Sequence, residues 1–303
     1  MPTITLPPGY LPATYNLDDK DYWIEGNRLV GDTYVTVGNG NNTWAAFTWA
    51  AIFTAGDGNN RVLGSGIYNS FILGNGHNNV ALSGDGNYLV VGNGGNTIQV
   101  AGVMQDVHCG SGADIVNVTG WASVVQSGGG NDSITLKGLS HTLDSGAGDD
   151  RIMITVDEGY WGPDSESKVR AGEGNDIIRY QSGGAFIDGG KGNDTIYIAK
   201  FTGEEYEGRL SACVIFDRPG DGIDDVVGDA MSVGNKFDVR QALAATDWDH
   251  DLATLSGYLH VVSSGRSTIV SVLESGAPPG AYTDIAIIHQ QVTYGEFLDH
   301  LYW

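Results

Sequence analysis

A Gly-x-Gly pair recurs every 18 residues along most of the chain, and this fixed period limits the fold more than any other feature. One longer step of 26 residues, after the seventh pair, leaves the pattern otherwise unchanged. The pairs begin at Gly38, Gly56, Gly74, Gly92, Gly110, Gly128, Gly146, Gly172 and Gly190. Such a period is typical of repeat architectures, in which each repeat packs mainly on its neighbours.

Two columns of apolar residues keep the same period as the glycine pairs. One column follows the pairs and consists of Val62, Val80, Ile98, Val116, Ile134, Ile152, Ile178 and Ile196. The other precedes them and consists of Val35, Phe53, Phe71, Leu89, Val107, Val125, Leu143, Val169 and Ile187. Apolar residues that alternate with polar ones predict short strands with one buried face. We therefore expect an all-β fold, a parallel β-roll or β-helix of about nine 18-residue turns.

Four residues after each pair begins, a short polar residue recurs and changes type halfway along the chain. The early turns have Asn42, Asn60, Asn78 and Asn96, and the later turns have Asp114, Asp132, Asp150, Asp176 and Asp194. Amide side chains both donate and accept hydrogen bonds, so they can stack as a ladder. A column of carboxylates requires a cation instead. The alternative is that both residue types serve only as turn formers.

The segment Gly189–Ile196 reads GGKGNDTI and resembles the G-G-x-G-x-D-x-U-x nonapeptide of the RTX proteins. Shorter matches end at the four earlier aspartates, and the segment GDGID adds Asp224. This resemblance implies several Ca2+ ions held by aspartate carboxylates and turn carbonyls. The implied sites comprise Gly110, Gly112, Asp114, Gly128, Gly130, Asp132, Gly146, Gly148, Asp150, Gly172, Gly174, Asp176, Gly190, Gly192, Asp194 and Asp224. Only single glycines such as Gly102 remain in the other half of each repeat, so calcium is expected along one edge.

The formal net charge of −22 is concentrated in the later turns. Residues 1–100 contain seven acidic and three basic residues, which leaves 30 acidic and 12 basic residues in the remainder. Such a chain is a poor partner for nucleic acid or an anionic membrane. Calcium that binds only the folded chain contributes directly to folding. We therefore expect the later turns to fold outside the cell rather than in calcium-poor cytosol.

The C-terminal segment resembles the targeting domain of RTX proteins exported by type I secretion. The matching features are Asp238, a helix within 239–245, the strand from Tyr258-Leu259, the strand 265–270, the turn 276–280 and a final helix with Leu298-Asp299-His300-Leu301. Thr293 and Glu296 predict a capping box for that helix. The resemblance implies a small β-rich domain with short helices and the type I machinery as a partner. No membrane insertion is expected, because no run of 18 apolar residues occurs.

These patterns together predict a domain organisation along the chain. It comprises a leader or assembly arm at 1–30, a β-roll at 31–200 with Asn-type turns at 31–105 and Asp-type turns at 106–200, a junction at 201–229 and the targeting domain at 230–303. The roll, the acidity and the leader favour a secreted structural component, a surface-layer, filament or matrix subunit that self-associates when Ca2+ is present.

Two alternatives involve polysaccharide. The chain contains neither H-E-x-x-H nor G-x-S-x-G, so zinc protease and lipase chemistry are not expected. A row of outward residues could serve a lyase or epimerase, and it consists of His108, Gln126, Asp144, Arg170 and Asp188. A glycan-binding adhesin would use Trp161 in the inserted loop 158–167. Cys109 is expected to be buried, and its pairing with Cys213 is left open.

Overall fold

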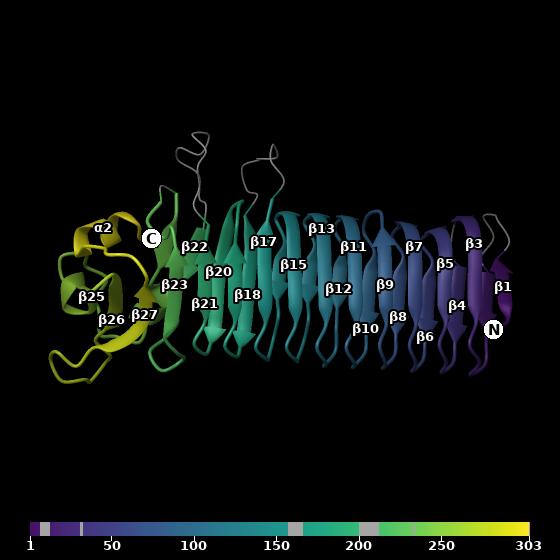
Figure 1. Cartoon of the computed structure of the whole chain (residues 1–303), viewed down its shortest axis with the longest axis horizontal. Helices are drawn as coiled ribbons and strands as arrows, with labels where there is room; N and C mark the ends of the chain where they lie inside the picture. The colour runs from purple at the N-terminus through teal and green to yellow at the C-terminus, as the bar shows by residue number, and fades with distance from the viewer. Residues whose placement is uncertain (7–12, 31–32, 157–165, 200–211, 233, 303) are drawn as a thin grey trace. The chain divides into compact units, whose positions relative to one another are not determined.

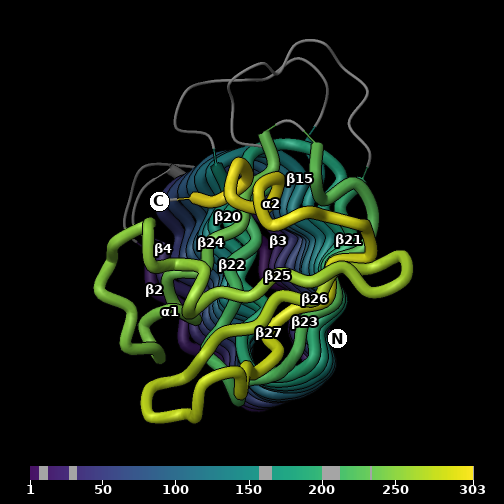
Figure 2. Tube along the Cα trace, turned by 90° about the vertical axis from the view of Figure 1, so that its left-hand side faces the viewer, coloured from purple at the N-terminus to yellow at the C-terminus, as the bar shows by residue number. Residues whose placement is uncertain are grey.

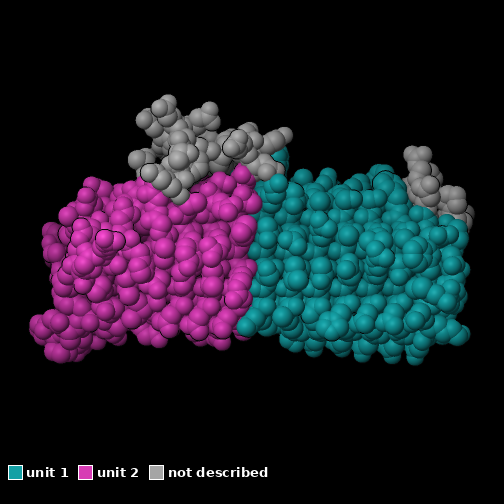
Figure 3. All heavy atoms as spheres, in the orientation of Figure 1, with its two compact units in different colours: residues 1–146 teal, residues 147–303 magenta. Residues whose placement is uncertain are grey.

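A computed structural model describes residues 1–6, 13–30, 33–156, 166–199, 212–232 and 234–302. They form two compact units, unit 1 (Met1–Gly146) and unit 2 (Ala147–Trp303), coloured separately in Figure 3. Both units consist mainly of short parallel strands, so the expected parallel β-solenoid is confirmed. The division between the units falls within the Asp-type turns rather than at residues 105, 200 or 230.

Each turn of unit 1 contributes one strand to each of two parallel sheets, called here sheet A and sheet B (Figure 1). Sheet A contains β1 (Thr3–Leu6), β3 (Trp23–Val30), β5 (Thr43–Trp49), β7 (Arg61–Ile67), β9 (Asn79–Ser83), β11 (Thr97–Val103), β13 (Ile115–Trp121) and β15 (Ser133–Leu139). Sheet B contains β2 (Ala13–Asn16), β4 (Thr33–Val37), β6 (Ile52–Ala55), β8 (Ser70–Leu73), β10 (Tyr88–Val91), β12 (Asp106–His108), β14 (Val124–Gln126) and β16 (Thr142–Asp144).

The two predicted apolar columns form the core between the sheets. Val62 lies opposite Val80, and Leu89 lies opposite both Phe71 and Val107. Every residue of both columns is at most 3 % exposed. Burying an aliphatic side chain of this size contributes about 1.5–3 kcal/mol. Similar apolar side chains from successive turns therefore stack on one another in the core, as the sequence predicts.

The strand pairing of unit 1 extends further toward the N-terminus than the glycine repeat does. Within the segment expected to be a leader, Thr3 lies opposite Trp23 in sheet A, and Ala13 lies opposite Thr33 in sheet B. Tyr22 is buried there. The described part of residues 1–30 thus forms regular strands.

Unit 2 repeats the two-sheet arrangement and then adds an antiparallel hairpin and short helices. Its part of sheet A contains β17 (Arg151–Thr155), β19 (Ile177–Tyr180), β21 (Thr195–Ile198), β23 (Asp224–Gly228), β27 (Thr283–Ile288), β26 (Ser267–Val272) and β25 (Leu259–Ser264). Its part of sheet B contains β18 (Ser167–Glu173), β20 (Ala185–Lys191), β22 (Ala212–Ile215) and β24 (Lys236–Asp238). The helical elements are α1 (Arg240–Leu243), η2 (Leu255–Gly257) and α2 (Tyr294–Asp299).

The C-terminal segment of unit 2 covers the last turn of its own sheets, as the end view in Figure 2 shows. Strand β27 pairs with β23, and the ring of Phe237 stacks between Phe216 and Phe297, with centroids 5.4 and 5.2 Å away. The Thr293–Glu296 capping box is confirmed. The expected C-terminal helices and strands are therefore present. Among the described helices, none has both the length and the apolar character needed to cross a membrane.

A run of sheet A turns in unit 1 has a glycine, such as Gly102, Gly120 and Gly138, that is required by close contact with the preceding turn. Gly120 has φ of +133°, and a Cβ atom there would lie 1.9 Å from the carbonyl oxygen of Gly102. We expect Gly120→Ala to destabilise the folded chain by at least about 2 kcal/mol, because both the conformation and the contact disfavour a side chain. Gly295→Ala in α2, where no atom lies within 4 Å of the added carbon, is the control and leaves stability nearly unchanged. Thermal unfolding measures both; equal melting temperatures for the two variants contradict this account.

Candidate metal centre

A ladder of buried asparagines runs through the early turns of unit 1. It consists of Asn42, Asn60, Asn78 and Asn96, each at most 1 % exposed. In the turn of Asn78, the amide nitrogen Nδ2 donates to Gly74 O at 3.0 Å, Gly76 O at 3.4 Å and Asn96 Oδ1 at 3.0 Å. The backbone N–H of Asn78 donates to Asn96 Oδ1 at 3.1 Å. Each Nδ2 therefore lies among three oxygen acceptors.

The oxygen of each asparagine completes the ladder from the other side. Asn78 Oδ1 accepts from the backbone N–H and the Nδ2 of Asn60, both at 3.1 Å. At the N-terminal end of the ladder, Asn42 Oδ1 accepts from the backbone N–H of Tyr22 at 3.1 Å. The buried amides of the early turns thus have partners for both oxygen and nitrogen, and these turns close without a metal ion.

The aspartates keep only half of this bonding pattern. In unit 1, Asn96 Nδ2 donates to Asp114 Oδ1 at 2.9 Å, and the N–H of Asp114 donates to Asp132 Oδ1 at 2.8 Å. In unit 2, the N–H of Asp176 donates to Asp194 Oδ1 at 2.8 Å, and the N–H of Asp194 donates to Asp224 Oδ1 at 3.2 Å. The aspartate Oδ1 atoms therefore accept a backbone N–H from the neighbouring turn, as asparagine Oδ1 does in the early turns. The second carboxylate oxygen replaces a nitrogen that donated three hydrogen bonds.

In three of these aspartates, the second carboxylate oxygen is buried without a hydrogen-bond donor. The Oδ2 atoms of Asp114, Asp176 and Asp194 have no hydrogen-bond partner, and each of these residues is 1 % exposed. Leaving a buried charged group unsatisfied costs more than the 1–3 kcal/mol typical of neutral groups. Two carboxylates about 5 Å apart add repulsion on the order of 3 kcal/mol at an effective dielectric constant near 20. Without a proton or a cation, this ladder opposes folding.

The pKa values of these carboxyls are raised accordingly. Burial raises the pKa of Asp114 to about 6, although hydrogen bonds from Asn96 oppose the shift. Burial raises the pKa of Asp176 to about 7 and that of Asp194 to about 6, and the nearby Asp194 and Asp188 charges add to these two shifts. In Asp224 the pKa reaches about 8, because burial acts together with the charge of Asp194. When no cation is present, these groups therefore take up a proton at a higher pH than a solvent-exposed aspartate does.

The backbone also differs between the two kinds of turn. The first glycine of the pair has a positive φ of 96° at Gly128 and Gly146, 111° at Gly172 and 89° at Gly190. The first glycines of the Asn-type turns, such as Gly74, lie outside this left-handed region. This change reorients the peptide groups next to the carboxylates. Gly110, which begins the first Asp-type turn, also lies outside this region, so it is the first glycines from Gly128 onward that have a conformational role that the sequence pattern does not reveal.

The residues present fit a hard cation bound chiefly by backbone. Within the described ranges, no three His, Cys, Asp or Glu side chains converge tightly enough to form a ready metal site. Carboxylate and carbonyl oxygens are the ligands that Ca2+ prefers, and it takes six to eight of them. Thiolate ligation is disfavoured, because burial and the Asp114 and Asp132 charges raise the pKa of the Cys109 thiol. Cys109 is half-buried rather than buried, and both it and Cys213 are free thiols.

A second buried polar ladder escaped the sequence analysis. It lies at the other corner of unit 1 and links Thr48, Asn69, Asn87, Gln105, Ser123 and His141. Asn69 Nδ2 donates to Asn87 Oδ1 at 3.0 Å, and Asn87 Nδ2 donates to Gln105 Oε1 at 3.3 Å. The positions from Asn69 to His141 are 18 residues apart, but their residue types vary, so no repeated motif marks them. This corner is held by neutral side chains.

An exposed ladder accompanies the buried one at the glycine pairs. Asn39 Oδ1 accepts from the N–H of Asp57 at 2.8 Å, and Asp57 Oδ1 accepts from the N–H of Asn75 at 2.8 Å. Asparagine and aspartate alternate here without difficulty, because water solvates the second carboxylate oxygen. Burial therefore determines whether aspartate is tolerated.

The outward row considered for catalysis is partly assembled in each unit. In unit 1, His108, Gln126 and Asp144 lie opposite one another on neighbouring strands. His108 Nδ1 contacts Gln126 Oε1 at 3.0 Å, and its Nε2 lies 2.8 Å from Asp106 Oδ1. In unit 2, Arg170 lies opposite Asp188. These contacts orient a histidine on the surface of sheet B.

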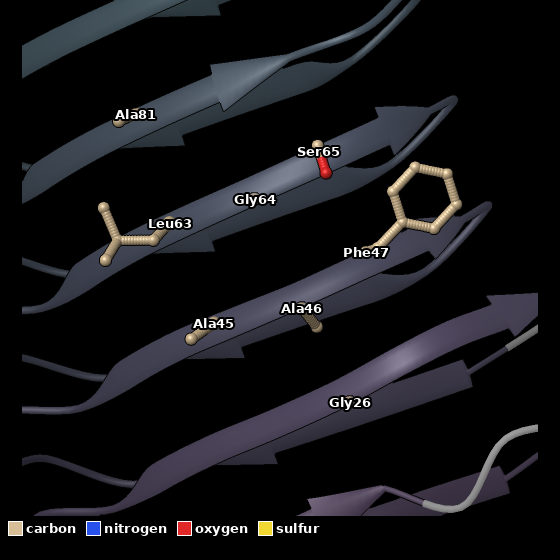
Figure 4. A pocket seen from close by; sticks show the side chains of 8 residues that line it. All are labelled: Gly26, Ala45, Ala46, Phe47, Leu63, Gly64, Ser65 and Ala81. Carbon is tan, nitrogen blue, oxygen red and sulfur yellow. The ribbon is translucent and has the colours of Figure 1, made fainter.

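A shallow groove of about 380 Å3 lies on sheet A of unit 1. Figure 4 shows that Ala45, Phe47, Leu63, Ser65 and Ala81 on β5, β7 and β9 line it. Phe47 is 49 % exposed, whereas the neighbouring Trp44 is buried. The eight lining residues include no ionisable side chain, so the groove suits contact with a partner rather than catalysis. Trp161 and most of the 158–167 loop lie outside the described residues.

Comparisons with known proteins gave no relative: no family model, no curated protein and no solved structure matches the chain.

The contrast between the ladders predicts opposite responses to the same substitution. Asn78→Asp places a carboxylate oxygen among the acceptor oxygens of Gly74, Gly76 and Asn96. In chelator at pH 7, we therefore expect the free energy of unfolding to fall by about 2–4 kcal/mol. The loss has an upper limit, because the new carboxylate can take up a proton instead of staying charged. Asn39→Asp in the exposed ladder is the matched control and changes stability by less than about 0.5 kcal/mol. Denaturant unfolding measures both, and equal losses refute the role of burial.

The raised pKa values predict an unusual pH dependence of the metal-free chain. The folded-state pKa of each ladder carboxyl exceeds its unfolded value, so the folded chain binds protons more tightly. Their contribution to stability is present below about pH 4 and is lost as the pH rises through 6 to 8. In chelator, the melting temperature should therefore fall from pH 5 to pH 8. A rising melting temperature over this range would show that the ladder does not control stability.

Proposed function

We propose that this chain is a secreted, calcium-binding RTX-type protein that acts as an extracellular structural component, a surface-layer, filament or matrix subunit. Its Asp-type turns fold when they meet external Ca2+, and the folded chains then self-associate. The turns that bind calcium contain Asp114, Asp132, Asp150, Asp176 and Asp194, with Asp224 at the end of the series. Catalysis is not part of this role.

One observation carries the calcium proposal. The Oδ2 atoms of Asp114, Asp176 and Asp194 are buried without a partner at positions equivalent to those where the asparagine ladder has an amide nitrogen. A cation there converts neighbouring oxygens from repelling groups into ligands. Ca2+ suits the oxygen-only donor set, and its concentration is far higher outside cells than in the cytosol. Folding is thereby coupled to location.

The sheet edges support self-association. Strand β1 ends the described order of sheet A, and β2 ends that of sheet B. Edge strands offer unpaired backbone groups to which another chain can add a strand. The exposed side chains of Thr3 and Thr5 on β1 leave this edge sterically open. Lysine is largely absent from the described strands at this edge, although charged residues commonly protect such edges.

The C-terminal elements support export by a type I system. Strands β25 and β26 and helix α2 lie in the segment that resembles RTX targeting domains, and this agreement with the expected elements supports the proposal. The −22 charge keeps a calcium-free chain extended, which suits passage through a channel before folding. The type I secretion machinery is accordingly the proposed cellular partner.

A second candidate function is a polysaccharide lyase or epimerase that uses the sheet B surface. The specific observation is that Asp106 and Gln126 hold both ring nitrogens of His108. An oriented histidine beside a carboxylate can abstract a proton from a sugar. It is the weaker proposal, because the row is split between the two units and only the His108 part has printed side-chain contacts to both ring nitrogens.

The decisive experiment compares the natural chain with an asparagine-ladder variant in which Asp114, Asp132, Asp150, Asp176 and Asp194 are all replaced by Asn. In chelator at pH 7, the Asp-type turns of the natural chain should be unfolded while its Asn-type turns stay folded, and in millimolar Ca2+ the chain should form large, chelator-reversible particles. The variant should fold in chelator, because each amide regains the donors that the early turns use, and it should bind fewer Ca2+ ions. Dynamic light scattering and calorimetric titration with Ca2+ report size and binding.

Two further results separate the parts of the proposal. Thr3→Lys with Thr5→Lys should bind Ca2+ as the natural chain does but assemble poorly. A natural chain that binds no Ca2+ refutes the calcium role, and one that compacts into a stable monomer in Ca2+ refutes the assembly role. In that second case, a polysaccharide turnover assay on His108→Ala decides whether the lyase candidate replaces it.

A further inference from the structure

A cluster of exposed apolar side chains lies beside the groove on sheet A of unit 1. Phe47 and Trp49 project outward from β5, and each is 49 % exposed. Trp49 lies opposite Ile67 of β7, and the next residue, Tyr68, is 57 % exposed. We call Phe47, Trp49 and Tyr68 the Phe47 patch. Apolar side chains that cluster on the surface of a folded chain mark a site of interaction.

The backbone at Tyr68 indicates that this side chain serves contact rather than stacking. Tyr68 has φ of +57°, in the left-handed region that bulky residues rarely adopt. At the equivalent positions of later turns, Gly86 has φ of +65° and Ala122 has φ of +54°, so the turn forms with little or no side chain. A Cβ atom added to Gly86 would lie 2.5 Å from Tyr68 Cδ1, so the tyrosine ring rests against Gly86. The ring is thus held in place although Tyr68 is largely exposed.

The groove and the patch together offer a protruding ring and a hollow on one face. Among the eight lining residues, Phe47 and Leu63 have long side chains, and the others are glycine, alanine or serine (Figure 4). The small residues Ala45 and Ala81 leave space on either side of Leu63. A two-fold contact requires a surface that is complementary to itself, and a ring beside a hollow meets this requirement.

The face around the Phe47 patch carries almost no charge. Among the side chains that β5, β7 and β9 direct outward, Arg61 is the single ionisable one. Two copies of a chain with a net charge of −22 repel each other over most of their surface. A nearly neutral face is therefore a place where this chain can meet its own copy.

The lining of the groove suits a protein surface better than a polysaccharide. Ser65 is the single residue with a polar side chain among the eight that line it. The hydroxyl groups of a sugar would lose hydrogen bonds to water here without replacing them. Apolar side chains of a second copy lose no hydrogen bonds, and their burial stabilises the contact.

We propose that two copies of this chain pair through the outer face of sheet A at the Phe47 patch, with Phe47 of each copy in the hollow beside Ala45 and Ala81 of the other. The inference rests on the proposed self-association and adds a second direction to it. Contacts through β1 and β2 extend the sheets, whereas this contact joins their faces. A layer or a bundle of filaments requires both directions of contact.

The size of this face predicts a weak contact between two copies. Strands β3, β5, β7 and β9 lie about 4.8 Å apart and rise about 3.3 Å per residue, so their outer face has a flat area of about 400 Å2. A stable interface buries about 800 Å2 on each partner. A single pair should therefore dissociate readily. Many such contacts act together once the sheet edges hold the copies in a row.

Sedimentation velocity of the full-length chain tests this contact in the Thr3→Lys, Thr5→Lys background, which weakens assembly through the sheet edge. In millimolar Ca2+, the background should show a concentration-dependent equilibrium between monomer and dimer. Phe47→Asp should raise the dimer Kd by at least about tenfold, because it removes the ring and buries a charge. Ala81→Phe fills the hollow and should also raise the Kd. Ile72→Asp is the matched control: Ile72 is 39 % exposed on β8 of sheet B, so the Kd should be unchanged.

The outcomes separate this inference from the proposed function. A background variant that stays monomeric at every concentration refutes the contact, while the calcium and edge parts of the proposal stand. Equal weakening by Phe47→Asp and Ile72→Asp also refutes it, because the added charge then acts wherever it is placed. If Phe47→Asp leaves the dimer intact but abolishes calorimetric binding of soluble cellulose oligosaccharides, the groove is a glycan site instead.

Failure of the calcium role gives a different result. A natural chain that binds no Ca2+ refutes that role, and dimerisation through Phe47 in the background variant then still supports the face contact. Circular dichroism verifies that each variant is folded, and Phe47→Ala replaces Phe47→Asp if that variant unfolds.

Discussion

Stacking in register places every side chain within one strand spacing, about 4.8 Å, of its counterpart in the next turn. The residue types suited to each position of the repeat are therefore those whose side chains can contact the same type of side chain in the next turn. Valine and isoleucine columns bury their surface, and asparagine columns connect an amide donor with an amide acceptor. A carboxylate column has acceptors only. Replacing asparagine by aspartate in this column therefore makes the stacked turns depend on a proton or a cation from solution.

Whether an aspartate in the stack needs a cation depends on whether its side chain is buried. Asp57 in the exposed ladder performs the same backbone-accepting role as Asn39 and Asn75, and water satisfies its remaining oxygen. Asp114 makes the corresponding contact inside the turn, where its Oδ2 has no donor. Aspartate consequently has little effect on stability in the exposed ladder. In the buried ladder, a few residues away in the same repeat, it depends on a proton or a cation.

The 18-residue period was enough to predict the strands, both apolar columns and the buried ladder, since these depend on repetition alone. The second ladder through Asn69, Asn87 and Gln105 was missed because its residue types vary while its hydrogen bonds persist. The strands β1 and β2 were missed because backbone pairing needs no glycine motif. The positive φ of Gly128 depends on backbone orientation, which a repeat pattern does not encode.

The arrangement of the two turn types within unit 1 has a physical advantage. Asn96 donates both its backbone N–H and its Nδ2 to Asp114 Oδ1, at 2.6 and 2.9 Å, so the last amide turn gives the first carboxylate turn two donors that need no ion. In a repeat fold, a new turn gains most of its stability from the neighbour on which it packs. The metal-independent turns therefore supply a formed surface on which the first aspartate turn can dock. Each of the following described carboxylates is preceded in the ladder by an aspartate, which offers a backbone N–H but no Nδ2 donor, and the need for a cation is correspondingly greater.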